Sequence, residues 1–213
     1  MNLRPFLRAL QAPSPPHTFN PWRDVDPSTD LPANAPAERV ARLTAHLNIR
    51  ARFVLIGEAS GYQGCKVSGI PFTSERLILE GDIPRVTTQA ARLSSRPRPW
   101  SEPSATTVWG TLHDLGIADQ TVLWNAFAWH PHRPGNPHTN RTPTPAERAA
   151  GLPLLSAALA LFPEAQVLAV GRQAQFALEQ LGVAATALRH PSMGGATQFR
   201  QQLRAALRRS NSQ

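Results

Sequence analysis

Four short apolar runs, separated by stretches with helical spacing, constrain the fold of this 213-residue chain more than any other feature. Each run is typical of a strand that is buried on both faces of a sheet. Strands that alternate with helices form mainly parallel sheets covered by helices on both sides. The sequence therefore predicts an α/β protein, a three-layer α/β/α sandwich with a central, mainly parallel four-stranded sheet. The predicted strands cover residues 53–56, 121–124, 167–170 and 184–188.

Helical spacing of apolar residues predicts the connecting elements. In the first helix, Val40, Leu43 and Leu47 fall on one face. A later helix should begin at Thr144, because Thr144-Pro145-Ala146-Glu147 combines a capping Thr, a tolerated Pro and a Glu three residues on. The long segment 58–104 is rich in Gly, Pro, Ser and Arg and is predicted to be mostly loop. The predicted helices cover residues 37–47, 106–115, 145–161, 172–181 and 196–209.

The first 36 residues carry eight prolines. Proline fixes φ and removes a hydrogen-bond donor, so we expect an extended arm here, without a helix or a core strand. The segment Asn20-Pro21-Trp22 is a candidate for pinning this arm to the body. The predicted organisation is therefore residues 1–36 as an arm packed on the body and residues 37–213 as one domain.

Composition excludes several classes of protein. Cys65 is the only cysteine, which excludes an internal disulfide, a four-cysteine zinc site and a four-cysteine iron–sulfur cluster. No stretch is apolar for the roughly 18 residues that a membrane span requires. The N-terminus lacks the pattern of a secretory signal. These features predict a soluble protein of a reducing compartment, the cytoplasm, with no membrane partner.

The balance of charge is basic, with 22 Lys and Arg against 14 Asp and Glu, a net charge of +8. Lys66 is the only lysine, and every other basic residue of this count is arginine. A GC-rich coding bias explains an excess of Arg, Ala and Pro. A polyanionic partner, most often nucleic acid, explains it equally well.

Polar residues follow the predicted strands at their carboxyl ends, where open α/β sheets bind ligands. Glu58 follows the first strand, Asn125 the second and His190 the fourth. Three segments lie at or after these ends: Gly57-Glu58-Ala59-Ser60-Gly61 with Gly69-Ile70-Pro71-Phe72-Thr73, Asn125 with Asn140-Arg141-Thr142-Pro143, and His190-Pro191-Ser192.

These segments, in this order, resemble the motifs of the uracil-DNA glycosylase superfamily, and the bacterial thermostable branches in particular. The resemblance covers roughly residues 20–207. It implies a glycosylase-like domain that flips uracil, or a related deaminated base, out of DNA and hydrolyses the N-glycosidic bond. It also implies a monomer that works in base-excision repair, with DNA as its partner and without a cofactor or a metal.

The resemblance assigns roles to individual residues. His190 would hydrogen-bond the O2 of the departing base, and Phe72 would stack on that base. Asn125 would present its amide to O4 and N3–H and so distinguish uracil from cytosine. The small residues Gly57, Ala59 and Gly61 would allow close approach of the base. The residues expected to contact DNA are Ser192, Met193 as an apolar wedge, Gly194 and Arg141.

The first motif departs from the pattern of the best-known branch. Ala59 stands where that branch has an Asp that positions the attacking water, and Ser60 replaces a Pro. Glu58 is then the nearest carboxylate and the candidate to orient water or to stabilise the cationic sugar. Equally, Glu58 could cap the following turn. A glycosylase that also nicks the backbone commonly uses an amine, and only Lys66 and the N-terminal amine are available. A monofunctional mechanism is therefore favoured.

Other hypotheses remain open from the sequence. The fold could serve as a catalytically silent module that binds damaged DNA, or the enzyme could remove hypoxanthine or xanthine. Trp100 lies in a polar stretch and could stack on exposed bases. The last helix could face phosphates through its arginines. The loop that carries His130, His132 and His138 is interpreted as a solvated loop that partly faces phosphates, and a metal site there is the alternative.

Overall fold

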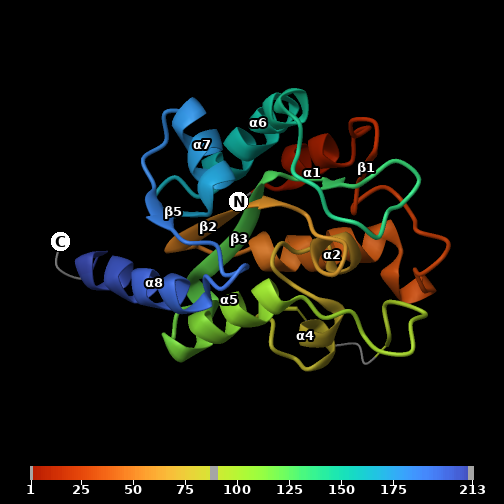
Figure 1. Ribbon diagram of the computed structural model, residues 1–213, viewed down its shortest axis with the longest axis horizontal. Helices are drawn as coiled ribbons and strands as arrows, with labels where there is room; N and C mark the ends of the chain where they lie inside the picture. Colours follow the sequence, from red (N-terminus) through yellow and green to blue (C-terminus); the bar gives the residue numbers. More distant parts are fainter. Residues whose placement is uncertain (1, 87–90, 211–213) are drawn as a thin grey trace.

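The computed structural model describes residues 2–86 and 91–210. Its core is a four-stranded parallel sheet in the order β3-β2-β5-β6. The predicted fold class is confirmed, and each predicted strand is present (Figure 1). The strands are β2 (Phe53–Ala59), β3 (Thr121–Phe127), β5 (Gln166–Val170) and β6 (Thr186–Leu188).

Helices cover both faces of this sheet, with α6 and α7 on one side and α5 and α8 on the other (Figure 1). The capping box predicted at Thr144 is present, because its side chain accepts from the Glu147 N–H and Glu147 accepts from the Thr144 N–H. The helices of the two layers are α6 (Pro145–Ala160), α7 (Arg172–Gln180), α5 (Pro103–Asp114) and α8 (Ala196–Ser210). None of the described helices is long and apolar enough to cross a membrane.

The prediction that the N-terminal segment lacks regular structure is wrong. Residues Arg4–Leu10 form helix α1, and Thr18–Phe19 (β1) pairs antiparallel with His130–Pro131 (β4). Pro5 lies in the first turn of α1, where a missing N–H is tolerated. Phe6 and Leu10 are buried, and the Phe6 ring contacts Trp124 of β3 edge to face. Docking of this apolar face on the sheet outweighs the high proline content.

Helix α2 (Pro36–Leu47) covers the edge strand β3. The Nε2 atom of His46 accepts a hydrogen bond of 2.9 Å from the Leu123 N–H. Complete burial lowers the pKa of His46 to about 3, so its ring is neutral and able to accept. This contact satisfies a strand N–H that would otherwise lack a partner. The short 3₁₀ turns η1 (Pro32–Asn34) and η2 (Ala118–Gln120) lie before α2 and β3.

The segment predicted to be loop contains two short helices, α3 (Cys65–Ser68) and α4 (Glu75–Leu79). The buried Glu75 carboxylate holds the later part of this segment in place, because it accepts hydrogen bonds from the backbone N–H groups of Leu93, Ser94 and Trp100. Burial alone would raise the pKa of Glu75, but hydrogen bonds from the Ser94 hydroxyl, the Trp100 N–H and Arg92 hold it below its ordinary value. Residues 87–90 of this segment lie outside the described residues.

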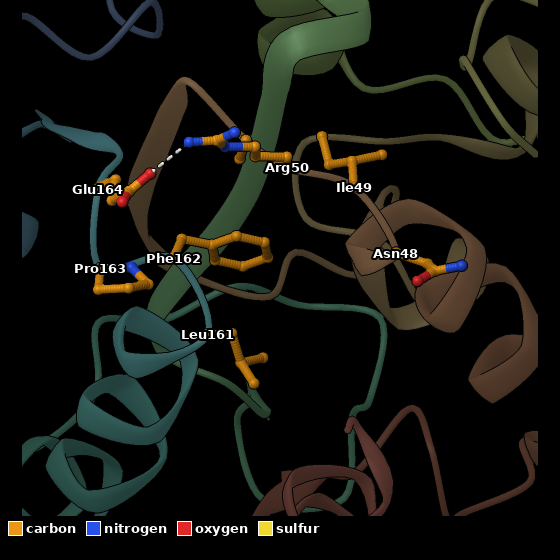
Figure 2. Close-up of a pocket in the computed structure, with 8 residues that line it drawn as sticks. Asn48, Ile49, Arg50, Leu161, Phe162, Pro163 and Glu164 are labelled. Carbon is orange, nitrogen blue, oxygen red and sulfur yellow. Dashed lines mark hydrogen bonds and ion pairs between the residues drawn. The ribbon is translucent and has the colours of Figure 1, made fainter. Parts of the chain in front are cut away.

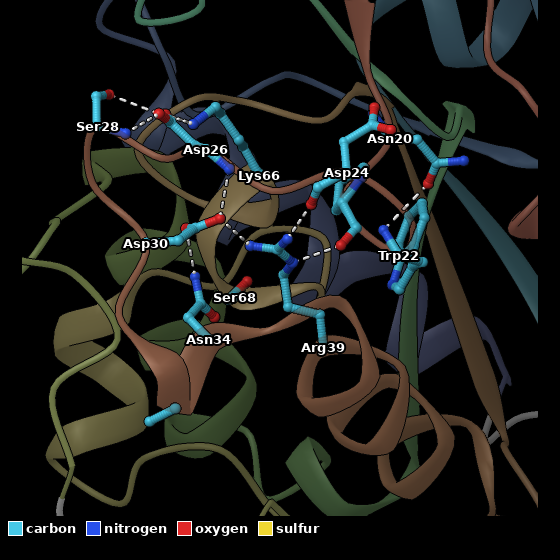
Figure 3. Close-up of polar contacts among 12 residues, drawn as sticks. Asn20, Trp22, Asp24, Asp26, Ser28, Asp30, Asn34, Arg39, Lys66 and Ser68 are labelled. Carbon is cyan, nitrogen blue, oxygen red and sulfur yellow. Dashed lines mark hydrogen bonds and ion pairs between the residues drawn. The ribbon is translucent and has the colours of Figure 1, made fainter.

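A network of buried charges fixes the N-terminal segment to the body (Figure 3). Asp26 contacts the Lys66 ammonium at 2.5 Å, and Asp30 contacts the Arg39 guanidinium at 2.9 Å. Trp22 is fully buried and donates to the carbonyl oxygen of Gly69. The segment predicted to pin the N-terminal residues therefore does so, through its tryptophan.

Candidate active site

The carboxyl ends of β2 and β3 bring Gly57 and Asn125 together, since these residues are register partners. A Cβ atom at Gly57 would lie 2.5 Å from the Phe72 ring and 2.6 Å from the Asn125 Oδ1 atom. Such distances are shorter than real Cβ contacts, so this position requires glycine. Three residues predicted for one site thus meet at one point.

Phe72 has an unusual backbone conformation for its type, with φ of 51°. Bulky residues adopt this left-handed region rarely and at an energetic cost. Its ring is 7% exposed and lies 5.9 Å from the His190 ring, centroid to centroid. The strained backbone holds an aromatic ring between the ends of the central strands and the histidine that follows β6.

The hydrogen bonds of His190 define its tautomer. The Ser192 backbone N–H donates to Nδ1 at 3.1 Å, and the Ser192 Oγ atom lies 2.7 Å from the same nitrogen. Because Nδ1 accepts, the proton of the neutral ring is on Nε2. Partial burial, and then the nearby charge of Arg189, lower the pKa of His190. At neutral pH the side chain therefore presents an Nε2–H donor.

Asn125 is 3% exposed. Its side-chain amide makes no hydrogen bond within the part of the chain that the structure describes. Buried amides normally have partners, because burial without one costs free energy. An amide that can both donate and accept is therefore available to a ligand at this position.

The loop after His190 closes tightly on itself. A Cβ atom at Gly195 would lie 2.1 Å from the His190 carbonyl oxygen, so the close approach requires glycine. Met193 has φ of 51° and is 91% exposed, which is unusual for a large apolar side chain. Ser192 and Gly194 are also exposed. The predicted DNA-contacting residues of this loop are thus presented to solvent beside His190.

Glu58 lies apart from this group. It borders a small cavity with Arg148 of α6 and Gln173 of α7, on the opposite side of the sheet from Phe72. Burial raises the pKa of Glu58, and Thr142 and Arg148 act in the opposite direction. Ala59 pairs with Phe127 and packs against the apolar cluster on the Glu58 side. The structure does not bring Glu58 to Phe72, Asn125 and His190.

Arg141 also lies outside the group. Its guanidinium forms two hydrogen bonds to the Glu147 carboxylate, at 2.6 and 2.7 Å, and donates to the carbonyl oxygens of His132 and His17. This arrangement ties the loop before α6 to its capping box. In the free protein the guanidinium therefore has a structural role, and the predicted contact of Arg141 with DNA stays a prediction.

The remaining polar residues of the sequence hypotheses have intramolecular partners. His130 contacts two carbonyl oxygens, and His138 contacts Asp26 at 3.0 Å. The described residues contain no cluster of three or more His, Cys, Asp or Glu able to hold a metal. Trp100 is 6% exposed and lies under Arg96, so it offers no open face to a base.

A groove of about 490 Å³ opens beside His190, between the start of α7 and one face of α8. It is lined by Arg172 and Arg189 and by glutamines of both helices, Gln175, Gln198, Gln201 and Gln202 among them. The face of α8 turned to it carries glutamines, whereas Arg200 and Arg204 are exposed and are not part of its lining. The groove is therefore polar and basic.

A second hollow, of about 410 Å³, lies at the other end of the sheet (Figure 2). Residues 48–51, which precede β2, and residues 161–164, which precede β5, line it. Arg50 and Glu164 form an exposed ion pair at 2.8 Å there. Because parallel strands all begin at this end, the hollow is remote from Asn125 and His190.

The family model described as the uracil DNA glycosylase superfamily matches residues 44–209. The chain belongs to the uracil-DNA glycosylase superfamily. Among solved structures, it is similar to wild-type SMUG2 of Pedobacter heparinus, with a TM-score of 0.68, 15% identity and coverage of 97% of both chains. At this identity the likeness concerns the fold. No curated protein matches.

One carboxyl group beside this superfamily site was not predicted from the sequence. Glu102 directly precedes α5, and its side chain lies against Gly61, the last residue of the first motif, and against Gly64. An acidic residue before a helix ordinarily interacts with the helix N-terminus. The Glu102 side chain makes no such capping hydrogen bond. No sequence signal distinguished Glu102, because it falls in the segment 58–104 that was predicted to be mostly loop.

Proposed function

We propose that this protein is a monofunctional DNA glycosylase that extrudes uracil, or a related deaminated base, and hydrolyses its N-glycosidic bond. The observation that carries the proposal is the fixed tautomer of His190, which leaves an Nε2–H donor on a ring that lies beside Phe72. Breaking the glycosidic bond leaves negative charge on the base, and a preorganised donor stabilises it. Membership of the superfamily supports the same reaction class.

In this mechanism the extruded base stacks on Phe72, with its polar edge toward the unpartnered amide of Asn125. His190 donates from Nε2 to the base oxygen on which charge develops. The exposed Met193 enters the space that the base leaves in the duplex. Water completes the reaction at C1′, and the products are an abasic site and the free base.

The environment of Lys66 supports a monofunctional reaction. Its ammonium is 2% exposed and contacts the buried Asp26 carboxylate at 2.5 Å, which opposes its use as a nucleophilic amine. The other amine considered, at Met1, lies outside the described residues.

The test is cleavage of labelled oligonucleotides with one uracil, single-stranded and opposite G or A, followed by alkali. We expect product only after alkali, and a loss of about 10²–10³-fold in rate for His190→Ala. Product formed only from DNA that contains hypoxanthine or xanthine would support the glycosylase reaction but show that its substrate is a different base. No product on any of these substrates would refute the proposal.

Binding to DNA should depend steeply on salt. The net charge of +8 and the basic groove beside His190 favour contacts to phosphates. Each contact contributes about −0.9 to the slope of log affinity against log salt on duplex DNA. A flat response would argue against DNA as the partner.

A further inference from the structure

Glu102 is a partly exposed residue whose carboxyl group is turned inward. Its Oε2 atom is buried and has no hydrogen-bond partner. No hydrogen bond or ion pair to either carboxyl oxygen is formed within residues 2–86 and 91–210. Leaving such a group unpaired costs free energy, so a carboxyl in this state calls for an explanation beyond stability.

The surroundings of Glu102 are segments that border the candidate site. A Cβ atom at Gly64 would lie 1.9 Å from Oε2 and 3.3 Å from the Thr73 carbonyl oxygen. A Cβ atom at Gly61 would lie 3.3 Å from Oε1 and 3.9 Å from the Asn140 amide. Glycine at both positions makes room for the carboxyl. The acid thus lies against the loop that follows β2, at Gly64, which is itself close to the Thr73 carbonyl oxygen next to Phe72.

Neither acidic candidate position of the first motif supplies a carboxylate on the side of Phe72. Ala59 has no acidic group, and Glu58 lies across the sheet against α6 and α7. Hydrolysis at C1′ benefits from a group that accepts the proton of the attacking water. Glu102 lies at the same end of the sheet as Gly57 and Asn125 and has no competing partner.

We propose that Glu102 is the catalytic residue that activates the attacking water; this inference rests on the proposed function. The water oxygen forms a bond to C1′ while the bond from C1′ to the base nitrogen breaks. The electron pair of that bond leaves with the base, where His190 stabilises the charge. The water proton passes to the Glu102 carboxylate and then to solvent.

The local electrostatics suit this role. Burial raises the pKa of Glu102 to about 7, near the working pH at which a general base is most effective. The neighbouring Cys65 thiol, whose pKa burial raises to about 12, stays neutral and so adds no charge. The Asn140 amide faces the same loop, where its Oδ1 accepts from the Tyr62 N–H.

Single-turnover base release by the full chain tests the proposal, on the substrate that the wild type cleaves best. We expect Glu102→Gln to lower the rate at least about 10²-fold. It should still bind an oligonucleotide with non-hydrolysable 2′-fluoro-deoxyuridine. The rise of rate with pH near neutrality should disappear, and Glu102→Asp should keep more activity than Glu102→Gln. The matched control is Glu164→Gln, at the remote end of the sheet (Figure 2).

The outcomes separate this inference from the proposed function. An active wild type whose rate and pH profile survive in Glu102→Gln would overturn the role of Glu102 alone. If Glu102→Gln lost thermal stability and DNA binding to the same extent as it lost rate, the catalytic role would be overturned in favour of a structural one. A wild type that releases no deaminated base would overturn both proposals.

Discussion

The Ser192 backbone N–H donates to Nδ1 of His190 across 3.1 Å, and this single contact determines which ring nitrogen carries the proton. Ser192 is only two residues along the chain, so the tight loop that ends at Gly195 sets the chemistry of the histidine. The loop thereby links two functions, because it also exposes Met193.

The pH dependence of activity should follow from this contact. Partial burial lowers the pKa of His190, so the neutral ring persists below the ordinary imidazole value of 6.5. Protonation would turn Nδ1 into a donor and break its contact with the Ser192 N–H. The His190-dependent activity should therefore be complete above the lowered pKa and be lost as pH falls through it. Titration of the His190 ring by NMR checks this, and a pKa above 6.5 would contradict it.

Gly57→Ala should abolish most activity while the protein still folds. The added methyl would lie 2.5 Å from the Phe72 ring and 2.6 Å from Asn125 Oδ1, so both side chains must move. Overpacking of this kind costs about 1–3 kcal/mol in the free energy of unfolding. The rate of base release and the free energy of unfolding should be measured for Gly57→Ala and for the control Gly110→Ala, where an added Cβ has nothing within 4 Å. Equal activity of the two variants would argue against close packing at Gly57.

Asn125→Asp should change which base is preferred. An ionised carboxylate only accepts, so it repels the O4 of uracil and favours the amino group of cytosine. Matched oligonucleotides with uracil, cytosine or hypoxanthine at one position measure the ratio of rates. Unaltered preferences would show that another residue reads the base.

Met193→Ala should leave the free energy of unfolding unchanged and lower the rate of base release from duplex DNA. The side chain is 91% exposed, and substitutions at such positions usually change unfolding free energy by less than about 0.5 kcal/mol. A wedge is needed where a base must leave a duplex, and less so on single strands. The ratio of duplex to single-strand rates should therefore fall. An equal loss on both substrates would count against a wedge.

Asp26→Asn should destabilise the fold by about 3–5 kcal/mol, because it leaves the Lys66 charge buried without a counterion. Burial alone would raise the pKa of Asp26, but hydrogen bonds from Lys66, Ser28 and His138 hold it well below its ordinary value of 3.8. The stabilisation is therefore present above pH 3.8 and is lost as pH falls below it. Urea unfolding of both proteins at several pH values measures this, and a constant difference down to acid pH would contradict it.

The sequence by itself determined the sheet and most of its helices. Apolar runs such as residues 53–56 and the capping box at Thr144 are local signals, whose period and spacing specify an element directly. The order of the motifs likewise predicted the superfamily that residues 44–209 match. Gly57, Asn125 and His190 were predicted for one site because parallel strands share their carboxyl ends, and Phe72 was added by the resemblance to the superfamily motifs.

Tertiary structure alone decided the features that depend on contacts between distant residues. Helix α1 forms because Phe6 docks on Trp124, a gain that outweighs the local proline signal. Arg141 pairs with Glu147, and Glu58 lies on the far side of the sheet, through the packing of α6 and α7. The Glu102 carboxyl lies against the loop after β2 because two glycines, 38 and 41 residues earlier, leave space for it. Local pattern fixes which element a residue joins, whereas its chemical environment is set by what packs against it.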